Sequence, residues 1–325
     1  MLNKFIFNSS ITRAIANCAY NFNKAQLASS PEINDVDSGI QFKKLKLNDR
    51  DLSETILTIK SKKRKQRDQK IIIEGNVLIK EALKAHLKPD KFIFSDIRKL
   101  NDFYKDIAKI VGNNVVKSIE NLKVPQTDLT FYSALTTCPG LIAIFDKPQL
   151  IPKKSNALPI TVISDGCKEP NNIGAIIRVC NSLPVSELLL PKGNVDIWDT
   201  KSIRGSSGSV FHLPTQTQLS WEEMDQKIGS DDLVLIADNN LSRYKSENVL
   251  DYDKIPDELI TNKGQFCVIV GGESQGISKE ALSFAKTRDW KVVNIPIEST
   301  ANSLNISNAL AIILFELRRK FNLLL

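Results

Sequence analysis

One carboxylate and several small polar residues lie close together in the C-terminal part of the chain. Glu273 follows two glycines that end an apolar run at 267–270, and Ser303 and Asn305 precede a long amphipathic stretch. The apolar run predicts a buried strand, and glycines at its end let a ligand approach the backbone closely. This pattern predicts a ligand pocket, without indicating which reaction takes place there.

A second group of polar residues lies farther upstream, again after a strand-like run. Residues 169–178 read EPNNIGAIIR and follow the apolar residues 160–164. Asn172 also suits a helix cap and Arg178 an ion pair, so both have ordinary structural interpretations. Between this segment and Glu273 lie further polar and small residues, namely Lys201, Arg204, Ser206 and Gly208, followed by FHLP at 211–214.

Together these segments resemble four motifs of the SpoU (TrmH-like) RNA ribose 2′-O-methyltransferases. Residues 169–178 are similar to the first motif of this family, and 201–214 to its intermediate pattern. Residues 271–278 (GGESQGIS), 295–296 (IP) and 303–305 (SLN) are similar to its last two motifs. Four motifs in the right order, over roughly half of the chain, are far more specific than a single glycine turn.

The chain departs from the usual family pattern at three positions. Glu169 stands where most members have Asp, Gly272 replaces the commoner Asn, and Cys180 occupies a position usually held by a small residue. None of these departures removes a proposed catalytic group. They indicate a divergent branch, and the chain most resembles the mitochondrial large-subunit ribosomal RNA guanosine 2′-O-methyltransferases.

The resemblance implies S-adenosylmethionine as the methyl donor, with no metal. In the family this cofactor is held by backbone of the glycine turn and of the last motif, which correspond here to Gly271, Ile295 and Leu304. The cofactor carries an electrophilic methyl group, so the protein has to position it and the nucleophile. The nucleophile implied is a ribose 2′-hydroxyl of RNA, a weak acid that must be oriented and lose its proton.

Five residues are the catalytic candidates, and Arg178 is the first of them. A guanidinium is hard to deprotonate, so we expect Arg178 to bind the neighbouring phosphate and stabilise developing alkoxide charge, with the proton acceptor left open. Glu273 is expected to partner Arg178 or the ribose. Asn172, Ser303 and Asn305 match polar residues of the first and last motifs, although each also suits a helix cap.

Composition places limits on the other possibilities. The chain has 325 residues, which suggests two domains, and a hydrophobic share of 42%, which is ordinary for a globular protein. Five scattered cysteines without metal-ligand spacing indicate free thiols in a reducing compartment. With only two histidines, a histidine-based metal or acid–base site is not expected.

The N-terminal segment has the composition of a mitochondrial transit peptide. Residues 1–31 contain Lys4, Arg13 and Lys24 and no acidic residue, without the compact apolar core of a secretory signal. A disordered tail is the alternative. We therefore expect residues 1–50 to be a transit peptide with a flexible linker, and the protein to lie in the mitochondrial matrix.

A basic stretch follows at 60–70, which reads KSKKRKQRDQK, with seven basic residues and one acid. Such blocks are most often solvated or flexible. In an RNA enzyme, phosphate contact is the better interpretation, because each lysine or arginine that neutralises a phosphate releases counterions. No aromatic residue is interleaved for base stacking, so the stretch would position RNA rather than read its sequence.

Two α/β units are expected to carry these motifs. Residues 51–147 alternate strand-like and helical stretches, as in the small RNA-binding domain of many SpoU members, and a linker follows at 146–158. From 158 to 325, strands at 160–164, 187–190, 233–237, 267–270 and 291–295 alternate with helices, which predicts a parallel α/β sheet. The last helix has an apolar stripe at Ile306, Leu310, Ile313, Leu314, Leu317 and Phe321.

The resemblance adds a C-terminal trefoil knot and a homodimer formed through that domain. The acid-rich segment 221–258 is expected on the outside, away from RNA. Two other functions stay open: a methyltransferase of the same family acting on transfer RNA, and a non-catalytic RNA-binding or ribosome-assembly protein on the same fold.

Overall fold

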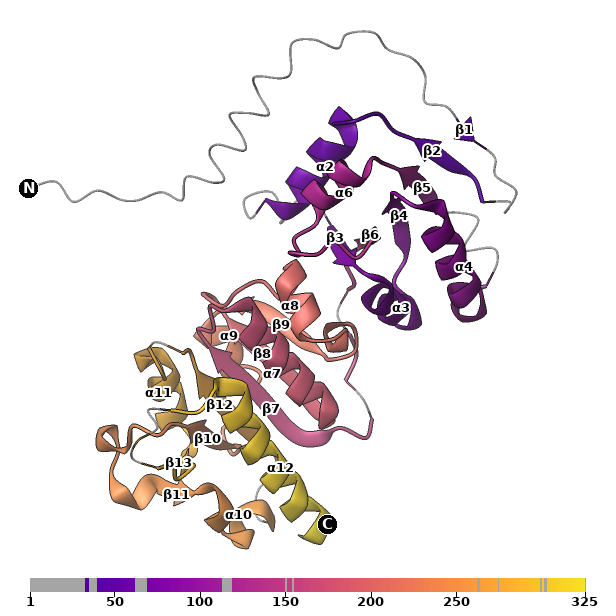
Figure 1. The fold of residues 1–325 in the computed structure, drawn as a ribbon. Coiled ribbons are helices and arrows are strands. Elements are labelled where there is room, and N and C mark those ends of the chain that lie inside the picture. Colours follow the sequence, from indigo (N-terminus) through magenta and orange to yellow (C-terminus); the bar gives the residue numbers. More distant parts are fainter. Residues whose placement is uncertain are drawn as a thin grey trace, which may run out of the picture.

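A computed structural model describes most of the chain, and it contains two α/β sheets joined by a linker (Figure 1). The described residues are 33–34, 40–61, 69–112, 119–149, 151–153, 155–261, 264–273, 275–298, 300 and 303–324. The expected transit peptide at 1–31 and most of the basic stretch, 62–68, lie outside the described residues.

The first sheet has six strands in the order β1-β2-β5-β4-β6-β3. Helices α2 and α6 cover one face and α3 and α4 the other, so β3, β6 and the end of β4 are buried on both sides and are largely apolar in sequence. The strands are β1 (Ile33–Asn34), β2 (Phe42–Lys44), β3 (Lys70–Glu74), β4 (Pro89–Phe94), β5 (Glu120–Lys123) and β6 (Leu141–Asp146). The helices are α2 (Arg50–Lys60), α3 (Asn76–Lys84), α4 (Ile97–Val111) and α6 (Gln126–Tyr132).

Strand β2 lies within residues 1–50, the segment predicted to be a transit peptide with a flexible linker. It pairs in parallel with β5. Phe42 is 6% exposed and packs edge-to-face on Phe94, with the ring centroids 5.8 Å apart. This aromatic contact explains why a short, lysine-rich segment joins the sheet.

The second sheet has seven strands, all parallel, in the order β11-β13-β10-β12-β7-β8-β9. The five strands expected from the sequence are confirmed, and so is the parallel α/β fold; the trefoil knot stays a prediction. The strands are β7 (Leu158–Asp165), β8 (Val185–Pro191), β9 (Thr215–Leu219), β10 (Leu233–Ala237), β11 (Val249–Asp251), β12 (Phe266–Gly271) and β13 (Asp289–Asn294).

Helices cover both faces of the second sheet. Helices α7 (Pro170–Ser182) and α12 (Ile306–Leu324) lie side by side on one face, and α9 (Trp221–Asp225) and α11 (Lys279–Lys286) on the other (Figure 1). The stripe predicted on α12 is confirmed from Leu310 onward, since these side chains are at most 4% exposed. The remaining helical segments are α8 (Thr200–Gly205), α10 (Asp257–Thr261) and the 3-10 turns Ser209–Phe211, Leu241–Arg243, Ser246–Asn248 and Tyr252–Lys254.

Two glycines let α7 and α8 touch along their backbones. A Cβ atom on Gly174 of α7 would lie 2.7 Å from the carbonyl oxygen of Ser202 and 2.8 Å from the Cα atom of Gly205, both on α8. Real Cβ atoms do not approach other atoms so closely, so any larger side chain at Gly174 would push the two helices apart.

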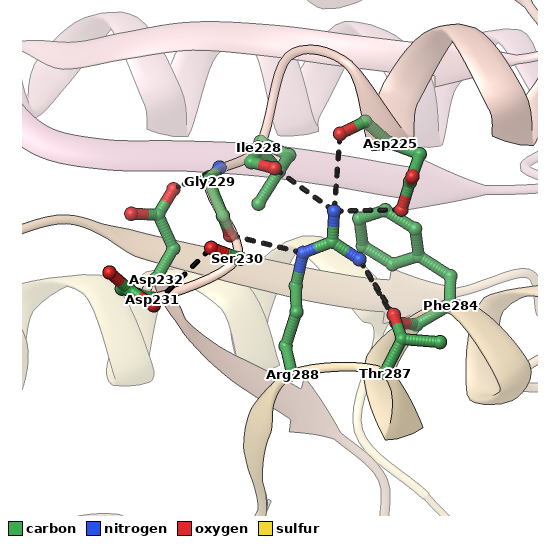
Figure 2. A network of polar contacts seen from close by, with 9 residues as sticks. All are labelled: Asp225, Ile228, Gly229, Ser230, Asp231, Asp232, Phe284, Thr287 and Arg288. Carbon is green, nitrogen blue, oxygen red and sulfur yellow. Dashed lines mark hydrogen bonds and ion pairs between the residues drawn. The ribbon is translucent and has the colours of Figure 1, made fainter.

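A buried arginine ties α9 to α11 on the opposite face (Figure 2). The guanidinium of Arg288 donates to the carbonyl oxygens of Gly229 and Ile228 at 3.1 and 2.9 Å and to the carboxylate of Asp225 at 2.8 Å. It also lies over the ring of Phe284, 4.2 Å from the centroid. Its planar array of donors therefore holds the segment that follows α9 against the end of α11.

Among the described residues, no helix is both long enough and apolar enough to cross a membrane.

Candidate active site

A cavity of about 540 Å³ opens at the carboxyl ends of the central strands of the second sheet. Strand pairing brings the last residues of β13, β10, β12 and β7 to the same edge, with Ala237 opposite Val293 and Val270, and Gly271 opposite Asp165. From β7 the chain runs outward through β8 and β9, and it returns to β10 on the other side of β7. The cavity thus lies at the switch point of the sheet, where open α/β folds bind their ligands.

The glycine turn after β12 forms one wall of this cavity. A Cβ atom on Gly271 would lie 2.3 Å from the carbonyl carbon of Gly276, so only glycine fits there. Gly276 has a φ of +63° and donates its N–H to the carbonyl oxygen of Gly272 at 2.9 Å. The turn therefore folds back on itself and presents bare backbone to the cavity.

The residues expected to hold the cofactor meet in this cavity. Gly271, Ile295 and Leu304 all line it, although they come from β12 and from the segment between β13 and α12. Leu304 is 38% exposed. Ser303, predicted as a polar residue of the site, lines the cavity beside Leu304.

A chain of side-chain hydrogen bonds joins three of the predicted catalytic residues at the edge of the cavity. The amide nitrogen of Asn172 donates to Glu273 Oε1 at 2.7 Å. The amide nitrogen of Asn305 donates to Asn172 Oδ1 at 2.9 Å. These residues are far apart in the sequence, on α7, after β12 and before α12, so the fold itself assembles the group.

Of the two asparagines that suited a helix cap, Asn305 caps a helix and Asn172 does not. Helix α7 begins at Pro170 with Glu169 as its N-cap, so Asn172 lies inside the first turn and does not cap the helix. Asn305 does cap α12, because its Oδ1 accepts from the N–H of Ser307 at 2.9 Å. It uses its nitrogen for Asn172 and its oxygen for the helix.

A buried cysteine supports the same carboxylate. The thiol of Cys167 lies 3.2 Å from Glu273 Oε1 and donates to it. Burial raises the pKa of Cys167 to about 12, with the neighbouring Glu273 adding to the effect. Burial alone would raise the pKa of Glu273, but backbone amides, Asn172 and Cys167 donate to the carboxylate and together hold its pKa below the ordinary value.

Arg178 lies outside this group. It is exposed on α7 and is not among the residues that line the cavity. No carboxylate of the described residues forms an ion pair with it, so the ordinary structural interpretation does not apply to its side chain either.

The other wall of the cavity contains two charged residues that the sequence motifs do not predict. Asp238 and Arg243 line it, and both lie in the segment 221–258 that was expected on the outside; that expectation is wrong for these residues, because the segment contains the central strand β10. Asp238 accepts from the hydroxyl of Tyr244 at 2.6 Å and from Arg243 at 3.4 Å. Arg243 also donates to the carbonyl oxygen of Ile277 at 3.0 Å, which fixes the β12 turn to this wall.

The charges around the cavity favour a cationic ligand. The ionisable residues that line it are Asp238, Glu273 and Arg243. Arg243 pairs with Asp238, so the carboxylate of Glu273 has no cationic side chain of the cavity beside it.

Comparison with solved structures places the fold among known RNA methyltransferases. The AdoMet-bound rRNA methyltransferase from Sinorhizobium meliloti superimposes with a TM-score of 0.66, at 20% identity, over 86% of this chain and 98% of that one. The SpoU methyltransferase AviRb from Streptomyces viridochromogenes superimposes with a TM-score of 0.67, at 21% identity, over 85% and 99%. At this level of identity the likeness shows the fold, and it confirms the expected fold class.

Sequence comparison extends this likeness to the family. Residues 159–315 match the family model described as the SpoU rRNA Methylase family. The human protein "rRNA methyltransferase 3, mitochondrial" is 30% identical over 87% of this chain and 76% of its own length, and the mouse protein of the same name is 28% identical over 88% and 76%. The chain therefore belongs to the SpoU rRNA methylase family of RNA methyltransferases.

Proposed function

We propose that this enzyme transfers a methyl group from S-adenosylmethionine to the ribose 2′-hydroxyl of a guanosine in mitochondrial large-subunit ribosomal RNA. The observation that carries the proposal is the hydrogen-bonded group of Asn172, Glu273 and Asn305 at the edge of the cavity. These residues match three separate motifs of the family. The names of the relatives support ribosomal RNA and the mitochondrion.

The cavity fits the cofactor. Its volume of about 540 Å³ lies in the range for a nucleoside-sized ligand, and the tightly folded Gly271–Gly276 turn contributes backbone to its wall. Gly271, Ile295 and Leu304 would hold it, with Glu273 as the nearby negative charge for a sulfonium. When bound, the cofactor supplies an electrophilic methyl group.

The protein's part in the reaction is positioning. Asn172 and Asn305 hold each other's amides in fixed orientations, and Glu273 fixes Asn172. Such a fixed polar group orients the 2′-hydroxyl toward the methyl group and stabilises the charge that develops as it loses its proton. Ser303 adds a hydroxyl at the same edge.

We propose a homodimer in which Arg178 serves the second subunit. Arg178 is exposed on α7, and the neighbouring helix α12 exposes Phe315, which is 52% accessible. Burying this ring against a second copy is favourable. In the proposed dimer Arg178 would reach the partner's cavity, and its guanidinium would bind the phosphate next to the reacting ribose.

The proposed domain 51–147, whose sheet also includes β1 and β2 before it, is assigned to RNA binding, and the proposed domain 158–325 is assigned to catalysis. Residues 1–31 would direct the protein to the matrix. A chain lacking them should lose mitochondrial import but keep methyl transfer in vitro, because the site lies far downstream. Import of the truncated chain at the full rate would disprove the targeting role.

The position of the methyl group tests the main proposal. The enzyme is incubated with labelled S-adenosylmethionine and mitochondrial ribosomal RNA, and the RNA is hydrolysed with alkali. A 2′-O-methyl group removes the hydroxyl that attacks the adjacent phosphate, so the label should appear in an alkali-resistant dinucleotide. Label in a methylated-base mononucleotide would contradict the proposal. Label found only on transfer RNA would favour the alternative of a transfer RNA methyltransferase. No label on any RNA would favour the alternative of a non-catalytic RNA-binding protein.

A further inference from the structure

A second hollow lies between the two sheet units, away from the cofactor cavity. It has a volume of about 270 Å³. Four lysines line it, two from the first sheet unit, one from the linker and one from α8. They are Lys60, Lys70, Lys147 and Lys201.

Two of these lysines are available for an anion. Lys60 donates to the carbonyl oxygen of Tyr132, and Lys70 pairs with Asp146 at 2.7 Å. Lys147 and Lys201 form no ion pair with any carboxylate of the described residues. Two aspartates also line the hollow and keep their negative charge: Asp199 accepts from the backbone N–H of Lys201 and Asp196 from that of Trp198, both at 2.9 Å. The four lysines outnumber these two carboxylates, so the charge of the hollow favours an anion.

Another hollow adjoins the first at Trp198. A neighbouring hollow of about 280 Å³ shares Lys147 and Trp198 with the first and runs along the edge strand β9. Trp198 is partly exposed and stacks on Phe211, with an interplanar angle of 23°. The two hollows, which share a lysine and a tryptophan, are together called the furrow; two adjoining hollows suit a polymer better than a compact ligand.

The first turn of α7 lies between the furrow and the polar group of the candidate active site. Pro170 lines the hollow, and Asn172, two residues later, bonds Glu273. Glu169 precedes this turn without capping it through its side chain. Residues two apart on a helix point to nearly opposite sides, so a strand in the furrow would have to pass around this turn to reach the polar group.

We infer that this furrow holds a single-stranded segment of the substrate RNA, with Lys147 and Lys201 on its phosphates and Trp198 stacked on a base. The inference rests on the proposed function and adds the path of the RNA. Unpaired lysines supply attraction that is independent of sequence, and every base has a face that stacks on an indole.

The test measures binding of a fluorescein-labelled 12-nucleotide single-stranded RNA of mixed sequence at several salt concentrations. The double variant Lys147→Gln/Lys201→Gln should bind about tenfold more weakly at low salt, and the slope of log K against log salt should fall by about 1.4, for two lost phosphate contacts. The matched control Lys227→Gln/Lys286→Gln removes the same charge from exposed positions around α9 and α11 and should keep the wild-type slope.

Trp198→Leu should weaken binding about tenfold with the slope unchanged, since stacking releases no counterions. Thermal melting followed by circular dichroism shows whether each variant is folded. If both double variants have the same slope of log K against log salt, while the wild type binds and methylates RNA, the RNA does not bind in the furrow. The proposed function would be unaffected by that result. A wild-type enzyme that neither binds nor methylates RNA would overturn both.

Discussion

At the scale of single residues, the candidate site is a small set of amides and one carboxylate whose orientations are fixed by one another. Glu273 accepts from Asn172 and Cys167 at the same oxygen, and Asn172 accepts from Asn305. None of these groups is a strong base or nucleophile. This chemistry suits a reaction in which the electrophile is brought by a cofactor and the protein orients a hydroxyl.

Replacing Arg178 with lysine should lower the turnover number about a hundredfold while leaving the affinity for S-adenosylmethionine nearly unchanged. Lysine keeps the positive charge but loses the planar pair of donors, and the side chain lies outside the cofactor cavity. Steady-state kinetics and calorimetric cofactor titration measure the two quantities. Arg98→Lys, on the exposed start of α4, is the control and should match the wild type. A large loss of cofactor affinity in Arg178→Lys would contradict the assignment.

The lowered pKa of Glu273 predicts how its contribution depends on pH. Because the folded-state pKa lies below the ordinary value, the ionised carboxylate stabilises the fold at all pH values above that ordinary value, and this contribution is lost as the pH falls through the folded pKa. Denaturant unfolding of the wild type and of Glu273→Gln should therefore differ at neutral pH and converge in acid. A difference that grows on acidification would show that the pKa is raised instead.

At the scale of elements, the start of α12 has two tasks. Asn305 caps the helix with its oxygen and holds Asn172 with its nitrogen. The segment before it, which includes Ser303 and Leu304, lines the cofactor cavity. The end of the cofactor site and the beginning of the last helix are thus fixed by one side chain.

The two tasks can be separated by substitution. Asn305→Asp keeps the capping oxygen and should leave the free energy of unfolding nearly unchanged, whereas Asn305→Ala should lower it by about 1 kcal/mol. Both lose the donor to Asn172 and should lower turnover together. Denaturant melts and initial rates provide the comparison. Full activity in Asn305→Asp would show that the bond to Asn172 has no role in the reaction.

The sequence predicts most strands of the fold because strands buried on both faces are continuous apolar runs, as in β10 and β12. It does not predict β5 (ENLK) or β9 (TQTQL), since each has few apolar residues; β9 forms the edge of its sheet, where one side is free. The motifs identify the polar group of the site. They do not indicate Asp238 or Arg243, because an acid-rich segment has the composition of a solvent-exposed loop.

At the scale of the whole molecule, each candidate site is proposed to need two chains. One subunit provides the cofactor cavity with Asn172 and Glu273, and the other provides Arg178 from the exposed face of α7. A symmetric dimer contains two such sites, each built in the same way.

Mixing two inactive variants tests this arrangement. Arg178→Ala and Asn172→Ala chains, each inactive alone, should regain about a quarter of the wild-type activity after being unfolded and refolded together in equal amounts, because half of the dimers are mixed and each mixed dimer has one intact site. Initial rates of methyl transfer provide the measurement. Refolding each variant by itself is the control. No recovery, with mixed dimers verified by mass spectrometry, would place Arg178 in the site of its own chain.

The contact between Gly174 and Gly205 has a consequence for how a nucleotide is chosen. Helix α8 carries Lys201 into the furrow, and α7 carries Asn172 to the methyl-transfer site, while the touching backbones prevent either helix from sliding past the other. A misplacement of about 1 Å costs on the order of a hundredfold in rate. If the RNA binds as proposed, a strand held at Lys201 would present its ribose at a fixed distance from that contact, and the position of the target along the backbone would contribute to its selection.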